Sequence, residues 1–280
     1  MISETAIKNE LVKISDILLL NGTLTESPGL INGKTGIAIF FFHYSQYTKN
    51  ILYADYAMDI IYEIQNQIHY NSSADYENGI AGIGVGIDYL IKNNFLISGN
   101  DIYEDLDKRM YRAVMYESYQ SFSMYEGLTG YGKYWLMRLR DQSVTKYAKE
   151  CLMHIIGEIK NNLSYISPDE KLDIYYLLHD LQKTPHFNNC SDIIKQYYKL
   201  DLFPSKDINI NFPYLNTHTI GNKAQIVKYN HYFTNSHNNN LHLDIEICPK
   251  STGIFDGYAG KGLLLLTTLN SVGSDWMYLL

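Results

Sequence analysis

The sequence predicts an all-α protein, an α/α toroid of about six helical hairpins whose inner helices begin in glycine-rich turns. Three observations support this fold class. A glycine-rich motif occurs four times, three of its copies stand at near-constant spacing, and the segments between them have the apolar periodicity of amphipathic helices. Because one hairpin cannot bury its apolar face alone, we expect neighbouring hairpins to pack into a ring with a common centre.

Each copy of the motif consists of a polar residue, Gly, any residue, Thr or Ala, Gly, any residue, and Gly or Ala. In the first three copies the first glycines, Gly33, Gly79 and Gly127, stand 46 and 48 residues apart. Gly257 follows 130 residues later, which is close to three repeats of about 43. We therefore expect two degenerate repeats within 141–250, at 172–181 and around 214–226. The four copies occupy residues 32–38, 78–84, 126–132 and 256–262.

Outer helices are predicted between the motifs, where apolar residues recur three or four positions apart. A capping box of Asp101 and Glu104 opens one of these stretches, and Ser167 with Pro168 signals the start of a later helix. Each inner helix is expected to begin near the second glycine of its motif, so that the N-termini meet at one end of the ring. A short strand or extended loop is expected at 241–247. The apolar stripes span residues 7–18, 57–68, 102–114 and 144–159, and the second glycines are Gly36, Gly82, Gly130 and Gly260.

The composition indicates one globular domain spanning residues 1–280. Apolar residues make up 46% and charged residues 19%, and no linker divides the chain. A formal charge of −7 argues against nucleic acid as a partner. Residues 1–20 lack the order of a signal peptide, and no apolar run is long enough for membrane insertion. Three widely spaced cysteines without a CxxC pair fit a reduced, cytoplasmic setting.

The polar residue before the first glycine of each motif is a candidate for binding. Two interpretations remain open for Asn32, Asn78, Glu126 and Asp256. They are helix N-caps, for which Asn and Asp are well suited and Glu is not. Alternatively, they form an acceptor-rich rim at the mouth of a central pocket, where helix dipoles favour acidic groups and a bound peptide offers N–H donors. A phosphate cradle is not supported, because neither a Gly-x-Gly-x-x-Gly turn after a strand nor a Gly-Lys-Ser/Thr sequence is present.

The repeated Gly-x-x-Gly pattern resembles the lanthionine synthetase C-like (LanC-like) family of α/α-toroid proteins. The resemblance covers residues 29–140, returns at 252–280, and is weak over 141–250. It implies a barrel of helical hairpins with the active site in its central cavity. In the cyclase members a zinc ion activates a cysteine thiol of a precursor peptide, and the thiolate adds to a dehydrated Ser or Thr to close a thioether ring. The stretch 33–44 resembles short, Bacteroidetes-type members associated with peptide maturation.

The zinc ligands of the family are not matched. The family places one cysteine in a Trp-Cys-Tyr-Gly-like turn and a Cys-His-Gly turn in the next repeat, and neither occurs here. Cys151 lies on an apolar helical stripe and is expected in the core, while Cys190 and Cys248 lie outside the motifs. His218, in a Thr-His-Thr-Ile-Gly sequence, is a weak candidate ligand, and His231, His237 and His242 are considered only as adventitious ones. We therefore expect no transition metal at the family's position.

The family's acid/base residues are matched in part. Its aspartate stands four residues before the first glycine of the second motif, where this chain has Asp75. Its histidine stands just before the glycine of the third motif, where this chain has Glu126. Without a metal these carboxylates can still perform acid/base chemistry, so Asp75 and Glu126 are the candidate catalytic residues. The alternative is that both are loop and capping residues.

Three functions follow as hypotheses, and whether the chain is an enzyme stays open. The leading hypothesis is a LanC-like protein in the maturation of a ribosomally made peptide, binding the precursor peptide or a partner enzyme with no cofactor. The second is an active cyclase that holds zinc through unrecognised ligands in 141–250. The third is a glycosidase-type α/α toroid whose paired carboxylates come from Asp75, Glu126 and Asp256.

Overall fold

The computed structural model describes residues 3–97, 103–142, 144–185, 187, 190, 192–194, 219–234, 249 and 251–280. Within these residues the protein is all-helical, and an isolated bridge joins Ser251 to Gly257. The all-α class predicted from the motif is therefore confirmed for the described chain. The predicted extended segment 241–247, the capping residue Asp101, the weak ligand candidate His218 and the adventitious candidates His237 and His242 lie outside the described residues.

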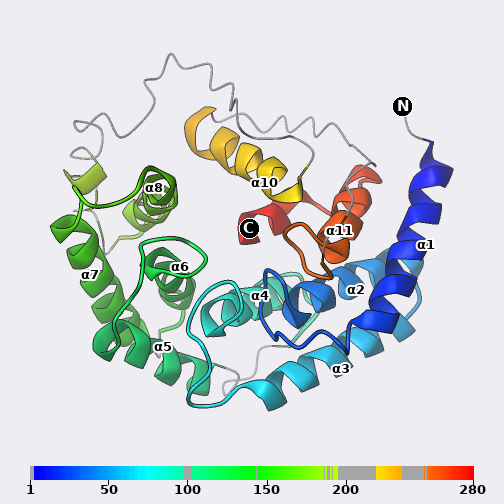
Figure 1. Cartoon of the computed structure of the whole chain (residues 1–280), viewed down its shortest axis with the longest axis horizontal. Coiled ribbons are helices and arrows are strands. Elements are labelled where there is room, and N and C mark those ends of the chain that lie inside the picture. The colour runs from blue at the N-terminus through cyan, green and yellow to red at the C-terminus, as the bar shows by residue number, and fades with distance from the viewer. Residues whose placement is uncertain are drawn as a thin grey trace.

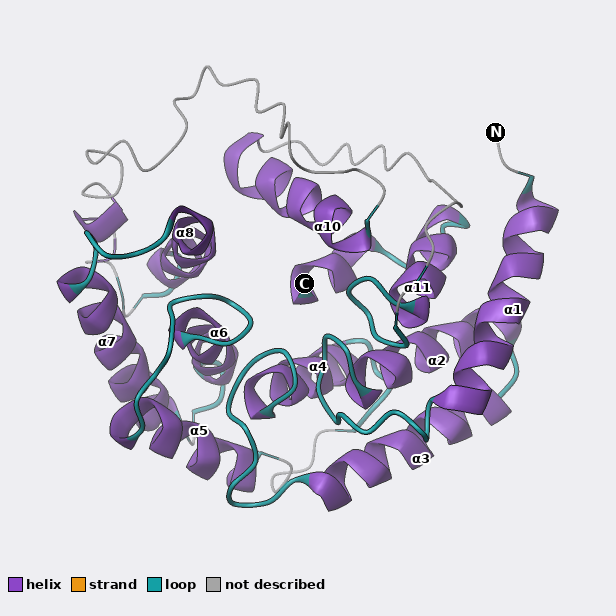
Figure 2. Ribbon diagram, viewed as in Figure 1, coloured by secondary structure: helices purple, strands orange, loops and turns teal. Residues whose placement is uncertain are grey.

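From α1 to α8, outer and inner helices alternate along the chain, as the apolar stripes predict (Figures 1 and 2). The outer helices are α1 (Glu4–Asn21), α3 (Leu52–Gln67), α5 (Glu104–Tyr116) and α7 (Thr145–Asn161). The inner helices are α2 (Lys34–Thr48), α4 (Ile80–Lys92), α6 (Leu128–Arg138), α8 (Pro168–Gln182), α10 (Ile220–Tyr229) and α11 (Tyr258–Thr268). A π-helical turn, η1 (Asn230–Thr234), continues α10, and a 3₁₀ helix, η2 (Ser274–Leu279), ends near the centre of the view in Figure 1.

The motif helices begin one residue after the first glycine, two residues earlier than expected. Gly33, Gly79, Gly127 and Gly257 are the N-caps of α2, α4, α6 and α11. The N-cap interpretation of the preceding polar residues is therefore wrong within their own helices. Glycine serves here because the loop that enters the helix folds back over its first turn.

The second and third glycines of the motif have different tasks. A Cβ on Gly82 would lie 1.9 Å from the carbonyl oxygen of Tyr76, six residues earlier in the entering loop. A Cβ on Gly132 would instead lie 2.5 Å from the side chain of Leu177 on the next inner helix. The second glycine thus lets the loop cover its own helix, and the third lets neighbouring inner helices approach closely.

The four entering loops form a continuous hydrogen-bonded series, which we call the loop belt. The amide of Ile254 donates to Ile31 at 2.8 Å, and the amide of Ile31 donates to Glu77 at 3.1 Å. The amide of Tyr76 then donates to the carbonyl of Tyr125 at 2.8 Å. The last motif therefore lies beside the first. The loop belt comprises residues 251–257, 27–33, 73–79 and 121–127.

The C-terminal segment 274–280 is packed into the middle of the inner helices (Figure 1). Trp276 and Met277 are fully buried, and Leu280 is 1% exposed. This segment forms one wall of the cavity described below. No described helix is both long and apolar enough to cross a membrane.

Candidate functional site

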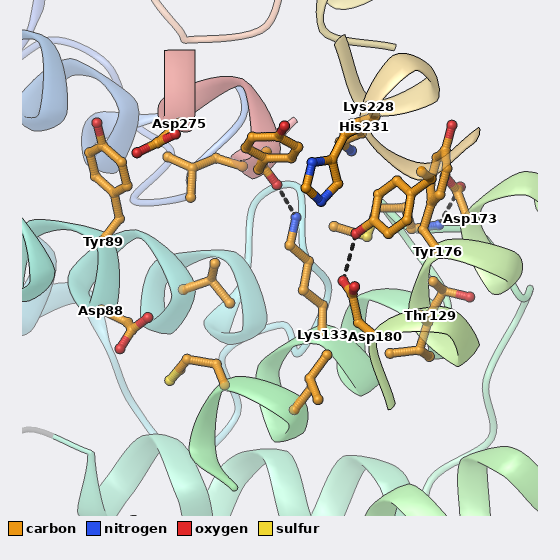
Figure 3. A pocket seen from close by; sticks show the side chains of 18 of the residues that line it. Asp88, Tyr89, Thr129, Lys133, Asp173, Tyr176, Asp180, Lys228, His231 and Asp275 are labelled. Carbon is orange, nitrogen blue, oxygen red and sulfur yellow. Dashed lines mark hydrogen bonds between the residues drawn. The ribbon is translucent and has the colours of Figure 1, made fainter. Parts of the chain in front are cut away.

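A pocket of about 440 Å³ lies among the inner helices α4, α6 and α8, with α10, η1 and η2 completing its walls (Figure 3). Its volume falls within the range of about 300–1,000 Å³ that is usual for ligand sites. Apolar side chains such as Val85, Leu136 and Leu177 alternate with charged ones. The charged side chains and tyrosines give the pocket its chemical character.

Three lysines line this pocket, and Lys92 among them pairs with Asp88, while Lys133 and Lys228 lie on other helices. Lys133, on the third-motif helix α6, donates through Nζ to the carbonyl oxygen of Tyr278. Burial and the nearby charge of Lys228 hold the pKa of Lys133 well below its ordinary value. Lys228, in the last turn of α10, is 5% exposed, and burial lowers its pKa to about 8. No described residue lies within hydrogen-bond or ion-pair distance of its Nζ, although Asp173 and Asp180 attract it from further away.

Two aspartates face the lysines from α8. The Oδ2 of Asp173 accepts the amide of Met124 at 3.0 Å, and burial raises the pKa of its carboxyl group. Burial also acts to raise the pKa of Asp180, but hydrogen bonds from its neighbours outweigh it and lower that pKa. Asp180 accepts from the hydroxyl of Tyr232 at 2.6 Å and from Nζ of Lys183 at 3.1 Å. The two carboxyl groups therefore differ in protonation behaviour within one pocket.

Aromatic side chains close the pocket between α8 and η1. Tyr176 stacks on Tyr232 with ring centroids 4.4 Å apart. The imidazole of His231 contacts Tyr232 edge-on at 5.0 Å and Tyr278 at 5.2 Å. Figure 3 shows His231 and Lys133 pointing into the pocket from different walls.

The wall formed by residues 274–280 is held through its backbone carbonyl groups. The hydroxyl of Tyr76 donates to the carbonyl of Leu279 at 2.8 Å, and the hydroxyl of Tyr125 donates to the carbonyl of Leu280 at 3.0 Å. Lys133 holds the carbonyl of Tyr278 in the same way. Tyr76 and Tyr125 belong to the loop belt, so the belt presents donors to a peptide backbone at the centre of the molecule.

The candidate catalytic residue Asp75 is engaged within its own loop. Its Oδ1 accepts the amide of Asn78 at 2.6 Å, and its Oδ2 accepts the hydroxyl of Ser73. Asn78 is exposed and accepts through its side chain from the hydroxyl of Ser27 at 3.1 Å. These contacts suit the alternative interpretation of Asp75 as a loop residue.

The other candidates differ from one another. Asn32 donates to the carboxylate of Glu77 at 2.7 Å and so ties two belt loops together. The carboxylate of Asp256 accepts the amides of Ile220 at 2.9 Å and Gly221 at 3.2 Å, so it caps the neighbouring helix α10. Glu126 is exposed, and its carboxylate has no hydrogen bond or ion pair with any residue that the structure describes. The belt brings Asp75, Asn32, Asn78, Glu126 and Asp256 onto adjoining loops, but none of them lines the central pocket.

The described residues do not fit the family's zinc site. No three His, Cys, Asp or Glu side chains among them come together so as to hold a metal ion. Cys151 and Cys190 are buried, and burial raises the pKa of both thiols, to about 11 for Cys190. The core position expected for Cys151 is confirmed, with the residue fully buried on α7. Cys248 lies outside the described chain.

Apart from His231, the pocket residues were not predicted from the sequence, although sequence signals exist for Lys133 and for the two aspartates of α8. Lys133 interrupts an otherwise glycine-rich and apolar inner helix directly after Gly132. Asp173 and Asp180 stand seven residues apart, two turns along one face of the segment 172–181 that was expected as a degenerate repeat. Lys228 and Tyr232 lie beyond any motif.

No family model, curated protein or solved structure matches this chain.

Proposed function

We propose that the protein is a LanC-like α/α toroid of six helical hairpins that binds a segment of a ribosomally made precursor peptide in its central pocket, in the cytoplasm, while that peptide is modified. The observation that supports binding of a peptide is the set of hydrogen bonds that hold the backbone of residues 274–280. Three donors, the hydroxyls of Tyr76 and Tyr125 and the amine of Lys133, hold successive backbone carbonyl groups beside an open cavity. Each tyrosine hydroxyl uses its one proton in these contacts, but the amine of Lys133 keeps further N–H donors next to unfilled volume, and these suit a second stretch of peptide backbone.

The toroid is supported by the succession of neighbouring inner helices. α2 packs on α4, α4 on α6, and α6 on α8. The stacked rings of Tyr176 and Tyr232 join α8 to η1, which continues α10. α10 contacts α11, and α11 returns to α2 and to α1 through the ion pair of Lys261 and Glu10 at 2.6 Å. Six inner helices in this closed order correspond to six repeats.

The proposal does not route any step through zinc, because the described residues supply no set of three donors. The alternative of an active cyclase therefore depends on ligands outside the described chain, such as His218. What the described residues provide is recognition of the backbone and charged groups that face it.

Photocrosslinking of the full chain tests the proposal. The probe is a pool of N-acetylated heptapeptide amides, each carrying one benzophenone side chain, and mass spectrometry locates the crosslinks. We expect crosslinks on α6, α8 and η1, and a loss of several-fold in Lys133→Met. Lys146→Met is the matched control, because Lys146 is exposed on the outer helix α7. Crosslinks confined to outer helices, or unchanged in Lys133→Met, would contradict the proposal.

One observation favours the glycosidase alternative. It concerns Asp173 and Asp180 and not the predicted carboxylates Asp75, Glu126 and Asp256. The pKa of Asp173 is raised and that of Asp180 is lowered in the same pocket, a pattern that separates a general acid from a general base. Seven residues of helix separate their Cα atoms by about 10 Å, and both side chains line the same pocket. Release of nitrophenol from a panel of aryl glycosides, abolished by Asp173→Asn, would favour this function over peptide binding.

A further inference from the structure

Lys228 is a buried charged residue of the pocket to which the proposed function assigns no role. Its side chain is 95% removed from solvent and lines the central pocket, and no described residue lies within hydrogen-bond or ion-pair distance of it. A buried charge without a partner costs several kcal/mol in general, so such groups are normally paired or neutral. Other buried lysines of the inner helices follow that rule. Lys34 pairs with Glu63 at 2.7 Å, and Lys261 pairs with Glu10 at 2.6 Å.

Asp173 and Asp180 do not form an ion pair with Lys228 at hydrogen-bond distance. Asp180 already accepts from Tyr232 and Lys183, and Asp173 already accepts the amide of Met124. Burial also favours the protonated form of Asp173. Lys228 is therefore left facing open volume with its charge only partly compensated.

Lys133, on helix α6, is a second pocket lysine whose charge is not compensated by an acidic partner at hydrogen-bond distance among the described residues. Its amine donates to a neutral acceptor, the carbonyl of Tyr278, and the charge of Lys228 makes the charged form of Lys133 less favourable. A negatively charged group between them would favour the charged form of both lysines at once. The remaining walls limit the charge of that group, because four aspartates line the pocket and repel a dianion more strongly than a monoanion. They are Asp88, Asp173, Asp180 and Asp275. A single carboxylate fits these conditions.

We propose that Lys228 and Lys133 bind a carboxylate of the ligand, the side chain of a Glu or Asp residue in the bound peptide. This proposal rests on the peptide-binding function proposed above and names the residue class that the pocket selects. The pocket's volume of about 440 Å³ accommodates such a side chain together with its flanking backbone. Lysine supplies point charges without the geometric selectivity of a guanidinium group, so either acidic residue is accepted.

Matched peptides test the proposal on the full chain. Two fluorescein-labelled heptapeptide amides, identical except for a central Glu or Gln, are titrated by fluorescence anisotropy. We expect the Glu peptide to bind at least about tenfold more tightly, the scale of a hydrogen bond to a charged group. Lys228→Met should reduce this preference to about twofold or less while the Gln peptide binds as before. Lys228→Arg should restore it, and Lys146→Met should leave it unchanged.

A second probe separates failure of this inference from failure of the proposed function. N-acetylglutamate α-amide and N-acetylglutamine α-amide are added to chain labelled with ¹³C at the lysine ε-carbons, and NMR reports shifts of the Lys228 and Lys133 signals. Equal binding of both peptides, with no shift caused by the glutamate compound alone, overturns the carboxylate site and leaves peptide binding standing. Binding of neither peptide, with shifts caused by the glutamate compound alone, overturns the peptide function and retains the carboxylate site. If neither peptide binds and neither compound shifts the signals, both proposals fall.

Discussion

The loop belt and the central pocket adjoin each other, but they differ in the pairing of their polar groups: most motif residues of the belt are paired within it, whereas two lysines of the pocket have no described acidic partner at hydrogen-bond distance. In the belt, Asn32, Asp75 and Asp256 each have a partner at hydrogen-bond distance, and the amides of one loop bond to the carbonyls of the next. In the pocket, Lys228 has no described partner at that distance, and Lys133 bonds to a single neutral oxygen. From this difference we infer that the residues of the repeated motif form the scaffold. The groups available for chemistry lie at positions where the repeats differ.

The largest expected effect tests the scaffold side of this comparison. Gly82→Ala places a Cβ 1.9 Å from the carbonyl oxygen of Tyr76, so the entering loop must move. We expect a loss of about 4 kcal/mol in the free energy of unfolding, measured in urea. Gly157→Ala is the matched control, because a Cβ there meets nothing within 4 Å on the outer helix α7. It should stabilise the chain by about 0.5–1 kcal/mol. Equal effects of the two changes would contradict the role assigned to the motif glycines.

The next effect concerns a buried base that supports the pocket wall. His43 is 5% exposed, its Nε2 lies 2.8 Å from the hydroxyl of the pocket residue Tyr89, and burial lowers its pKa to about 4. The unfolded chain binds a proton near pH 6.5 and the folded chain does not, so this stability is full above pH 6.5 and is lost as the pH falls towards 4. The loss is about 3 kcal/mol.

His43→Leu checks this assignment, because it removes the titrating ring from the same site. The difference in unfolding free energy between the wild type and this variant should change by about 3 kcal/mol between pH 6.5 and 4. A difference that stays constant over that range would show that His43 does not titrate as its burial requires.

A change of opposite sign is expected in the pocket. Lys228→Met replaces a buried ammonium group, which has no described residue at hydrogen-bond distance, by an apolar side chain of similar length. The variant should therefore be more stable by about 2 kcal/mol at pH 7. The pKa of Lys228, about 8 in the folded wild type, also predicts a pH dependence of stability. The wild type gains stability as the pH rises from 8 towards 10.5, where only the unfolded chain keeps the proton, and the variant lacks this gain. Thermal and urea unfolding at pH 7 and 9.5 measure both, and a destabilised variant at pH 7 would contradict the prediction.

The smallest effect separates two residues at the same position of the motif. Asp256→Ala removes the acceptor for two amides at the start of α10 and should cost about 1–2 kcal/mol. Glu126→Ala removes an exposed carboxylate without a described partner and should change stability by less than about 0.5 kcal/mol. If Glu126 belongs to a binding rim, its substitution weakens peptide binding while the melting temperature is unchanged. A clear drop in stability with unchanged binding would instead make it structural.

The sequence was sufficient to predict the helices and insufficient to predict the pocket, for physical reasons. Apolar periodicity and the start signal at Ser167 are local, and Ser167 indeed forms a capping box with Glu170. The role of Asp256 is not local, because the helix that it caps begins 36 residues earlier in the chain. Lys228 and Tyr232 matter because of side chains on other helices, and no motif marks them. The helix starts were misplaced because the folding of the loop over Gly82 is a tertiary effect.

The meeting of the last motif with the first also has a kinetic consequence. Thr252 and Thr25, 227 residues apart, lie 3.0 Å apart through their hydroxyl oxygens, and Ile254 bonds to Ile31. Contacts between such distant residues bring high contact order, which slows folding. During synthesis, residues 25–31 therefore lack these contacts until residues 251–280 emerge from the ribosome. These same residues bring η2, one wall of the pocket, so the pocket of an unfinished chain is incomplete.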